Sequence, residues 1–188
     1  MLKKLNNWWR WYRHPLPTEL REFHQSVVID GIEYDLMPAQ LAHAEAMLAV
    51  ERDAYFGQEP WPIELFWNEI NRQHERLYLI VQIKATHTTV AYIGTAFRPS
   101  LREVHITNLA VNRQWQKRGL GKFMLSYIMS VAAQIQFETV SLEVRMTNQA
   151  AQKLYSRLGF RKVRTKHHYY DDGEDAVEMR STLGKGRL

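Results

Sequence analysis

The feature that most constrains the fold is a six-residue segment, residues 116–121, with the sequence Gln-Lys-Arg-Gly-Leu-Gly. It follows an alternating, strand-like segment at 103–111 and opens a segment at 119–134 whose apolar residues recur at helical spacing. N–H groups at such a helix start are available to an anion, and the helix dipole favours negative charge. The segment therefore predicts an α/β fold with a phosphate site at residues 116–121. A plain glycine-containing turn is the alternative.

The remaining segments extend this pattern along the chain. Strands are expected at 32–36, 77–84, 89–97, 139–145, 161–168 and 176–183, and helices at 38–56, 62–71 and 148–158. The order predicts a mixed α/β sheet with helices on both faces. With 188 residues, the chain fits one domain. We place that domain at 31–183, after an extension at 1–30 that is partly helical from 18 to 24, and before a short tail at 184–188.

The extension contains three tryptophans within four positions, interleaved with arginine. This mixture is compatible with binding to a membrane surface or to RNA. The favoured interpretation is that the tryptophans cover an exposed edge of the domain, because clustered tryptophans rarely stay in water without a partner. We therefore expect no membrane partner, and RNA binding by residues 1–30 is the alternative.

Composition excludes several classes of protein. The absence of cysteine excludes a disulfide scaffold, a cysteine-based zinc site and a cysteine nucleophile. No run approaches the ~18 apolar residues of a membrane span, and the first residues lack the apolar core of a signal peptide. A cytoplasmic location is therefore expected. The net charge of +5 favours acidic partners but equally fits an ordinary basic surface. No histidine spacing predicts a metal site.

Several sequence blocks resemble a known family. Residues 116–121 match the coenzyme A signature (Arg or Gln)-x-x-Gly-x-(Gly or Ala) of the GNAT superfamily at every fixed position. The blocks at 106–111, 142–145, 148–160 and 169–176 resemble one branch, the RimI group. These bacterial enzymes acetylate the N-terminal alanine of small-subunit ribosomal protein eighteen. Pro60-Trp61 resembles the group's Pro-Trp-Ser segment, with Pro62 where serine is usual. The resemblance covers about residues 32–179 and not residues 1–30.

This resemblance implies a GNAT fold, with a splayed central strand, and acetyl transfer from acetyl-CoA to an amine. Loop amides would hold the cofactor pyrophosphate, and amides at Leu109 and Val111 would stabilise an oxyanion. The cofactor-binding residues implied in this way are Leu109, Ala110, Val111, Gln116, Lys117, Arg118, Gly119, Leu120, Gly121 and Asn148. Asn148 would contact the pantetheine arm and could also cap the helix that follows it.

Two side chains are candidates for proton transfer. Glu143 lies on the strand face opposite Leu142, and the family's general base falls on it. A half-exposed glutamate paired with Arg145 or another cation is the alternative. Tyr155 matches the family's general acid, although its place in an apolar helical stripe would by itself indicate a core residue. His105, on the strand at 103–111, is expected to be packed rather than catalytic.

Further residues are predicted to bind the acceptor substrate, the molecule that receives the acetyl group. Trp61, Tyr169 and Tyr170 are expected to shape a peptide groove. Asp175, with Glu174, would hold a cationic peptide end or cap the acidic turn. The predicted reaction is acetylation of the N-terminus of a ribosomal protein. The alternatives are other protein N-termini, a small amine, or a non-catalytic acetyl-CoA-binding module, and the presence of both Glu143 and Tyr155 argues against the last.

Overall fold

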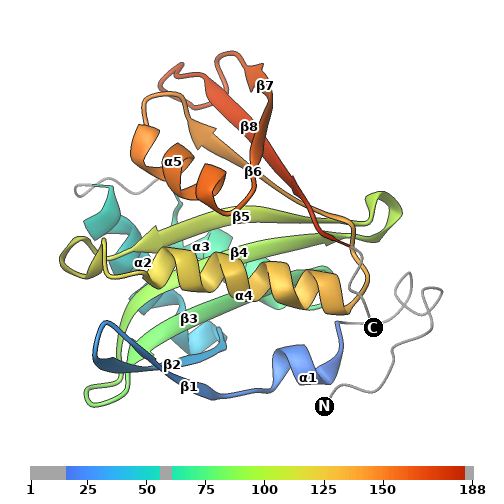
Figure 1. Cartoon of the computed structure of the whole chain (residues 1–188). Helices are drawn as coiled ribbons and strands as arrows, with labels where there is room; N and C mark the ends of the chain where they lie inside the picture. Colours follow the sequence, from blue (N-terminus) through green and yellow to red (C-terminus); the bar gives the residue numbers. More distant parts are fainter. Residues whose placement is uncertain (1–15, 56–60, 185–188) are drawn as a thin grey trace. The chain divides into compact units, whose positions relative to one another are not determined.

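The computed structural model describes residues 16–55 and 61–184. Five α-helices and eight strands make up these residues, together with three short 3-10 helices (Figure 1). The helices are α1 (Thr18–Arg21), α2 (Ala44–Ala54), α3 (Ile63–Asn71), α4 (Leu120–Gln134) and α5 (Gln149–Arg157). The strands are β1 (Gln25–Ile29), β2 (Ile32–Pro38), β3 (Arg76–Ile83), β4 (Thr88–Arg98), β5 (Glu103–Val111), β6 (Thr139–Arg145), β7 (Arg161–Lys166) and β8 (Ala176–Thr182).

The strands form one mixed sheet in the order β1-β2-β3-β4-β5-β6-β8-β7. Neighbours along β1–β4 are antiparallel, as are β6 with β8 and β8 with β7. β5 pairs with β6 in parallel, from Glu103 opposite Thr139 to Ile106 opposite Leu142. This register ends at Ile106, while β5 itself runs on to Val111. The mixed sheet flanked by helices confirms the predicted fold class.

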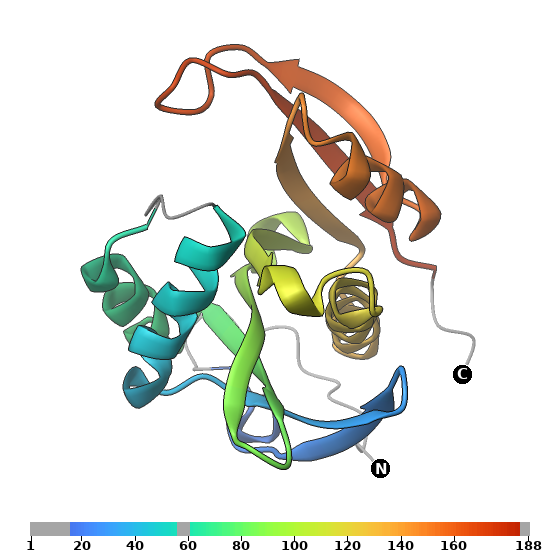
Figure 2. The same ribbon diagram turned by 90° about the vertical axis from the view of Figure 1, so that its left-hand side faces the viewer.

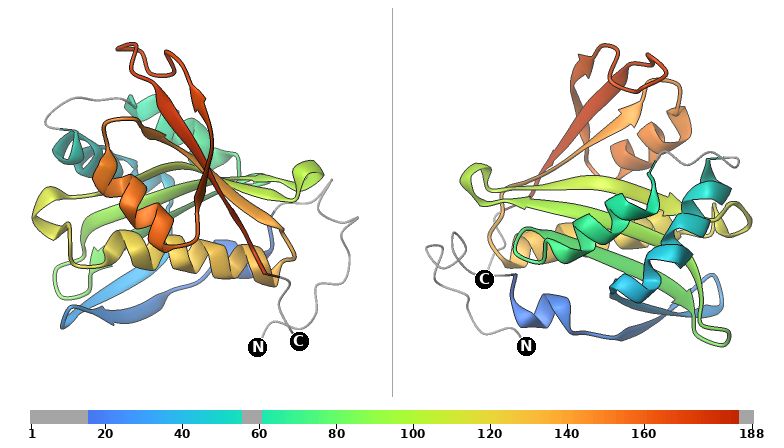
Figure 3. Two further views of the ribbon diagram at one scale, coloured as in Figure 1. Left: turned by 45° about the horizontal axis from the view of Figure 1, so that its top comes forward. Right: turned by 180° about the vertical axis from the view of Figure 1, so that it is seen from behind.

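The chain divides into two compact units. The first comprises the described residues up to Ala96 together with Asn108–Met124. In it, α2 and α3 lie against one face of the β2–β4 strands (Figure 3). The helix α2 buries Ala44, Met47, Leu48 and Glu51, which recur at helical spacing and face a core that includes Tyr92. A carboxyl group therefore occupies one position of an otherwise apolar stripe.

The second unit comprises Phe97–Thr107 and the described residues from Leu125 onward. Here β6, β8 and β7 form a three-stranded ribbon with α5 beside it (Figure 2). The side chains of Val140, Leu142 and Val144 on β6 are buried, as alternation of the strand predicts. This unit carries both residues that the sequence analysis assigned to proton transfer.

Most element bounds agree with the sequence analysis to within two or three residues, but one strand was missed and one helix begins later than expected. Strand β1 was not predicted, although it lies in the stretch assigned to the extension and pairs with β2 through a turn at Asp30-Gly31. The helix expected at 38–56 begins later, because β2 continues to Pro38 and a 3-10 turn at Leu41–His43 precedes α2. The helix expected at 18–24 ends at Arg21. The tryptophan cluster, Gly57, Pro60 and the end of the tail lie outside the described residues.

Candidate active site

One face of the ribbon in the second unit carries charged and polar side chains. Across β6 and β8, Glu143 lies opposite Glu178, and Ser141 lies opposite Arg180. Strand β7 contributes Arg164 and Lys166 to the same face, because Arg164 lies opposite Glu178 and Lys166 lies opposite Ala176 on β8. The neighbouring strand β5 contributes one more, opposite Ser141. We call this the polar face; its side chains are His105, Ser141, Glu143, Arg164, Lys166, Glu178 and Arg180.

Glu143 sits at the centre of the polar face. It is the residue directly after Leu142, where the β5–β6 pairing ends. One carboxylate oxygen accepts a hydrogen bond from Lys166 Nζ at 2.5 Å, and the other lies 3.1 Å from His105 Nε2. Burial raises the pKa of Glu143, but hydrogen bonds and charges from His105 and Lys166 outweigh it and lower the pKa to about 2. Glu143 is therefore a carboxylate throughout the neutral range.

His105 reaches Glu143 from β5 and is held on its other side as well. Its Nδ1 lies 2.9 Å from the hydroxyl oxygen of Ser141, and both side chains are buried. Both ring nitrogens thus have partners within the unit, and the burial agrees with the expectation that His105 is packed.

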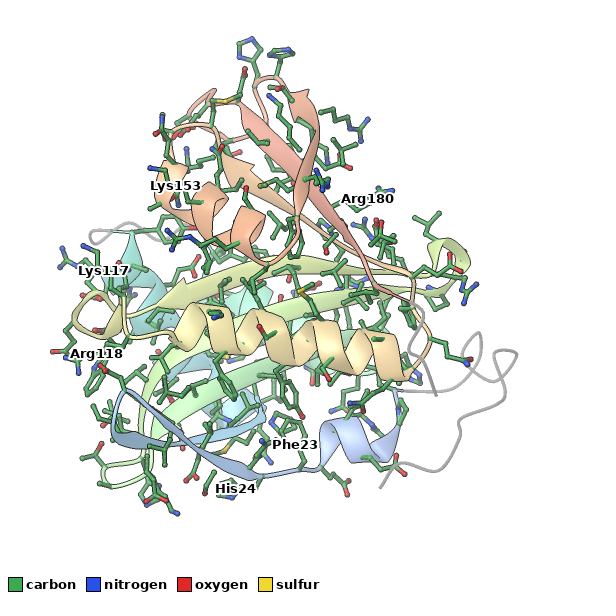
Figure 4. The ribbon with its side chains drawn as sticks, viewed as in Figure 1. Phe23, His24, Lys117, Arg118, Lys153 and Arg180 are labelled. Atoms are coloured by element: carbon green, nitrogen blue, oxygen red, sulfur yellow. The ribbon has the colours of Figure 1, made fainter. Side chains whose placement is uncertain are left out.

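Tyr155 lies on α5, the helix beside the ribbon (Figure 2). It is buried on α5, with its ring 6.0 Å from that of Phe160. Gly159, which ends this helix segment, comes so close to β8 that a Cβ there would lie 3.5 Å from the hydroxyl of Ser181. In Figure 4, Lys153 of α5 and Arg180 of the polar face point away from opposite sides of the unit. Glu143 and Tyr155 therefore belong to one unit and come from consecutive elements, the strand β6 and the helix α5.

The start of α5 is fixed by Asn148. Its side-chain oxygen accepts a hydrogen bond from the backbone N–H of Ala151 at 3.0 Å, so the predicted helix cap is confirmed. The cap uses the side-chain oxygen and leaves the side-chain NH2 group of Asn148 available for a second contact. A role toward a cofactor arm stays a prediction.

The loop 116–121 lies in the first unit and has the backbone that the sequence suggested. Lys117 and Gly119 have positive φ angles of 61° and 96°, and α4 begins at Leu120. The first turn of α4 contains no acidic residue, and its N–H groups have no partners within the helix. Figure 4 shows Lys117 and Arg118 projecting from this loop. These donors and cations fit a diphosphate.

Aromatic and amide side chains brace the loop. The Arg118 guanidinium lies 4.8 Å from the centroid of the Trp115 ring, which in turn meets Tyr34 edge-on at 6.2 Å. Gln116 donates from its side chain to the carbonyl oxygen of Val111 at 3.0 Å. Gln116 therefore ties the loop to the end of β5 rather than extending its side chain toward a ligand. Its assignment to cofactor binding stays a prediction.

The central strand's last residues differ in burial. Ala110 is buried in the core cluster of the first unit, whereas Leu109 and Val111 are only partly buried. Asn108 accepts a hydrogen bond from the Tyr78 hydroxyl at 3.1 Å, which fixes the strand just before these positions. The role of the amides of Leu109 and Val111 toward an oxyanion stays a prediction.

The residues assigned to an acceptor peptide are divided between the two units. Trp61 packs on the core of the first unit, with its ring 5.7 Å from Phe66. Tyr169 and Tyr170 of the second unit meet edge to face at 5.2 Å. Asp175 accepts hydrogen bonds from the His168 backbone at 2.9 Å and pairs with the His167 ring at 2.8 Å. Asp175 therefore serves the turn, one of the two roles expected for it.

Glu174 is also engaged in structure. It accepts hydrogen bonds from the Thr147 hydroxyl and backbone, at 2.6 and 2.9 Å, and from Arg145 at 2.7 Å. Hydrogen bonds from Thr147, with that of Arg145, lower the pKa of Glu174 to about 2. Arg145 also stacks over Tyr170 at 4.0 Å. The acidic turn is thus bound to the segment between β6 and α5.

Sequence reasoning missed the partners of Glu143. Lys166 was assigned only to a strand, and His105 was not linked to Glu143. A cation opposite Glu143 was foreseen as one alternative, but its identity depends on strand register. In the part of the chain that the structure describes, no group of three or more acidic, histidine or cysteine side chains is arranged to hold a metal ion. The helices described there are also too short or too polar to cross a membrane.

The sequence is similar to a family model and to proteins of known name. Residues 44–160 match the family model described as the acetyltransferase (GNAT) family. An N-alpha-acetyltransferase of Sulfurisphaera tokodaii is 29% identical over 164 residues, covering 81% of this chain and 95% of the relative. N-alpha-acetyltransferase RimI of Mycobacterium tuberculosis is 31% identical over 146 residues, covering 76% of this chain and 89% of the relative.

The fold is also similar to that of a solved structure. The crystal structure of the ribosomal-protein-S18-alanine N-acetyltransferase from Escherichia coli superposes with a TM-score of 0.70. It is 25% identical in sequence and covers 82% of this chain and 99% of its own. The similarity therefore extends over nearly the whole length of that enzyme.

Proposed function

The chain belongs to the acetyltransferase (GNAT) family and is an acetyl-CoA-dependent acetyltransferase, and from this premise we propose that it acetylates the N-terminal α-amine of a protein. The proposed acceptor is the N-terminal alanine of small-subunit ribosomal protein eighteen. Two relatives named N-alpha-acetyltransferase support the reaction, and the enzyme named ribosomal-protein-S18-alanine N-acetyltransferase supports the acceptor. The observation that carries the proposal is the largely buried carboxylate of Glu143, whose side chain is 10% exposed, at the end of the β5–β6 pairing.

Acetyl-CoA supplies the acetyl group as a reactive thioester. The loop 116–121 is proposed to bind its diphosphate through the amides at the start of α4, with Lys117 and Arg118 adding positive charge. Gly119 supports this role because its positive φ lets the backbone turn into the helix. The amides of Leu109 and Val111 are proposed to donate hydrogen bonds to the acetyl carbonyl.

Glu143 is proposed to attract the acceptor's α-ammonium group and to take its proton, directly or through a water molecule. A carboxylate with a pKa of about 2 is a weak base. A weak base suffices here because an N-terminal amine has a pKa of only ~7.7–8.0, so part of it is already neutral near pH 7.5. Electrostatic attraction then becomes the larger part of what Glu143 contributes.

Tyr155 is proposed to return a proton to the sulfur of the leaving thiolate. A thiol has a pKa near ~8.5 and a phenol near ~10, so this transfer is slightly uphill. A buried phenol held by the packing of α5 compensates through orientation, since a fixed donor loses little freedom in the reaction. Asn148 is proposed to steady the cofactor arm at the start of the same helix.

The acceptor class can be tested by measuring release of the CoA thiol with three amines. One is a peptide that begins Ala-Arg-Tyr and carries one internal lysine, the second is the same peptide with its N-terminus already acetylated, and the third is spermidine. We expect turnover with the first only. Faster turnover of spermidine would identify a small-amine acetyltransferase, and turnover of the blocked peptide would place the acceptor on a side chain.

A further inference from the structure

The position of Lys166 raises a question about how an acceptor reaches Glu143. The α-ammonium group of a protein and the side-chain ammonium of lysine are the same chemical group, each with three N–H donors. Lys166 already occupies one carboxylate oxygen of Glu143, at 2.5 Å. A second ammonium at that oxygen would meet like-charge repulsion at close range. The acceptor and Lys166 therefore compete for one site.

The two partners of Glu143 are not equally replaceable. His105 is 10% exposed and is anchored by Ser141 on its far side. The Lys166 side chain is 27% exposed, and its ammonium group is at the end of a long, flexible chain. An acceptor arriving from solvent would therefore displace Lys166 and leave His105 in place.

Lys166 has a second set of partners close by. Its ammonium nitrogen lies 3.5 Å from a carboxylate oxygen of Glu178 and 5.2 Å from the centroid of the Tyr169 ring. An aromatic face attracts a cation, and a carboxylate does so more strongly. A small rotation of the side chain would exchange Glu143 for these two partners. Burial disfavours the charged form of Lys166, but Glu143 and Glu178 together raise its pKa, so it stays an ammonium.

Glu178 can hold Lys166 because it is itself fixed. Arg164 donates to it at 2.7 Å, and Arg180 lies 3.5 Å from its other oxygen. Arg180 is shared with Glu103 at 3.2 Å, and Glu103 is also bound by Arg98. The carboxylate of Glu178 is thus a stationary second site on the polar face.

We infer that Lys166 is a displaceable counter-ion that occupies Glu143 in the free enzyme and moves to Glu178 and Tyr169 when the acceptor's α-ammonium binds. This inference rests on the proposed function, because it assumes an ammonium acceptor at Glu143. It makes Lys166 a residue that sets how strongly the enzyme prefers a free N-terminus. Lys166 is a positioning residue in this account, since it acts through Glu143.

The test compares two ligands on the full-length enzyme with CoA bound. One is the Ala-Arg-Tyr peptide, and the other carries a propionyl group in place of alanine, which removes only the α-amine. Both dissociation constants are measured by calorimetry. The dissociation constant of the propionyl peptide divided by that of the Ala-Arg-Tyr peptide reports the contribution of the α-ammonium. Lys166→Met should raise this ratio about three- to tenfold, because the competing charge is gone. Lys166→Arg, which keeps the charge, should leave the ratio near the wild-type value.

Glu178→Gln gives a change of opposite sign. It removes the second site, so Lys166 stays on Glu143 and the ratio should fall below the wild-type value. Lys162→Met, at an exposed lysine on the same strand, should change nothing. General damage to the fold would not move the ratio in opposite directions in two variants.

Two failures can be told apart. If the wild type acetylates the Ala-Arg-Tyr peptide but Lys166→Met leaves the ratio unchanged, the inference is wrong and the proposed function stands. If the wild type neither acetylates that peptide nor binds it better than the propionyl analogue, and Lys166→Met does not change this, the proposed function and the inference both fail.

Discussion

At the scale of single residues, Glu143 and Tyr155 are proposed to have separate tasks in one reaction, proton removal from the amine and proton donation to the thiolate. Removing the carboxylate charge with Glu143→Gln should lower kcat/KM for the peptide about 100-fold, because both the attraction of the ammonium and the proton acceptor are lost, and removing the phenolic proton with Tyr155→Phe should lower kcat by a similar factor. Both changes conserve shape, so the melting temperature should move little. Initial rates of thiol release at saturating acetyl-CoA measure the effect. Glu138→Gln and Tyr127→Phe serve as matched controls and should keep wild-type rates; wild-type rates in the two test variants would refute the assigned roles.

Glu51 gives a second residue-scale prediction, this time for stability. Burial raises its pKa from 4.5 to about 6, although a hydrogen bond from Tyr92 opposes the shift. The folded state therefore holds the proton more tightly than the unfolded chain. The resulting stabilisation is complete below pH 4.5 and is lost as pH rises through 6. Since one pKa unit is worth 1.36 kcal/mol, the loss is about 2 kcal/mol.

Glu51→Gln removes this pH dependence while keeping a hydrogen-bond acceptor for Tyr92. Between pH 4.5 and 7.5 the variant should gain about 2 kcal/mol relative to wild type, measured as the free energy of unfolding in urea. Glu45→Gln, at an exposed position on the same helix, should track the wild type at both pH values. An unchanged difference between wild type and Glu51→Gln would show that Glu51 is not held protonated.

Single-residue predictions from sequence succeeded where a local rule applies. Alternation put Glu143 opposite the apolar face, and the position of Asn148 before a helix identified a cap. The partners of Glu143 follow no local rule. Lys166 is 23 residues away and His105 comes from another strand, so their contacts depend on how β5, β6 and β7 are aligned. Nothing in the sequence specifies that alignment.

At the scale of elements, the loop before α4 depends on a backbone conformation that favours glycine. Gly119 has a φ of 96°, and a Cβ there would meet only Ile29 Cγ2, at 3.5 Å. Gly119→Ala should therefore cost about 1 kcal/mol of stability through backbone strain alone. It should also weaken binding of CoA, because the loop amides shift. Chemical unfolding and calorimetry with CoA measure the two effects separately.

Gly31→Ala is the matched control for that change. Gly31 has a φ of 75° and open space around it, and it lies in the β1–β2 turn. Alanine there should cost a similar amount of stability but leave the affinity for CoA unchanged. Equal losses of affinity in both variants would show that the loop 116–121 has no special part in cofactor binding.

Elements were predicted best where periodicity is strong. The bounds of β5 and β6 agree with the expected ranges, because each alternates and ends at a clear break. Strand β1 was missed because both of its faces are partly exposed, so it lacks an apolar alternation. The signal that could have found it is Asp30-Gly31, whose positive φ angles of 52° and 75° suit a two-residue hairpin turn.

At the scale of the whole molecule, the order of elements along the chain predicted a mixed sheet but not the order of strands within it. The sequence does not say that β8 lies between β6 and β7, or that β5 pairs with β6 only as far as Ile106. Those two facts give Glu143 its neighbours and its place at the end of a pairing. The reaction was predicted from the family signature, whereas the neighbours of Glu143 follow only from the arrangement of the sheet.

The most direct test of the central claim is the site of acetylation on a peptide that offers two amines. The peptide begins Ala-Arg-Tyr and carries one internal lysine, and the product formed from acetyl-CoA by the full-length enzyme is mapped by fragment-ion mass spectrometry. Acetyl on the α-amine, with the lysine unmodified and Glu143→Gln about 100-fold slower, is the predicted result. Acetyl on the lysine alone, or an α-amine product formed equally fast by Glu143→Gln, would contradict the account.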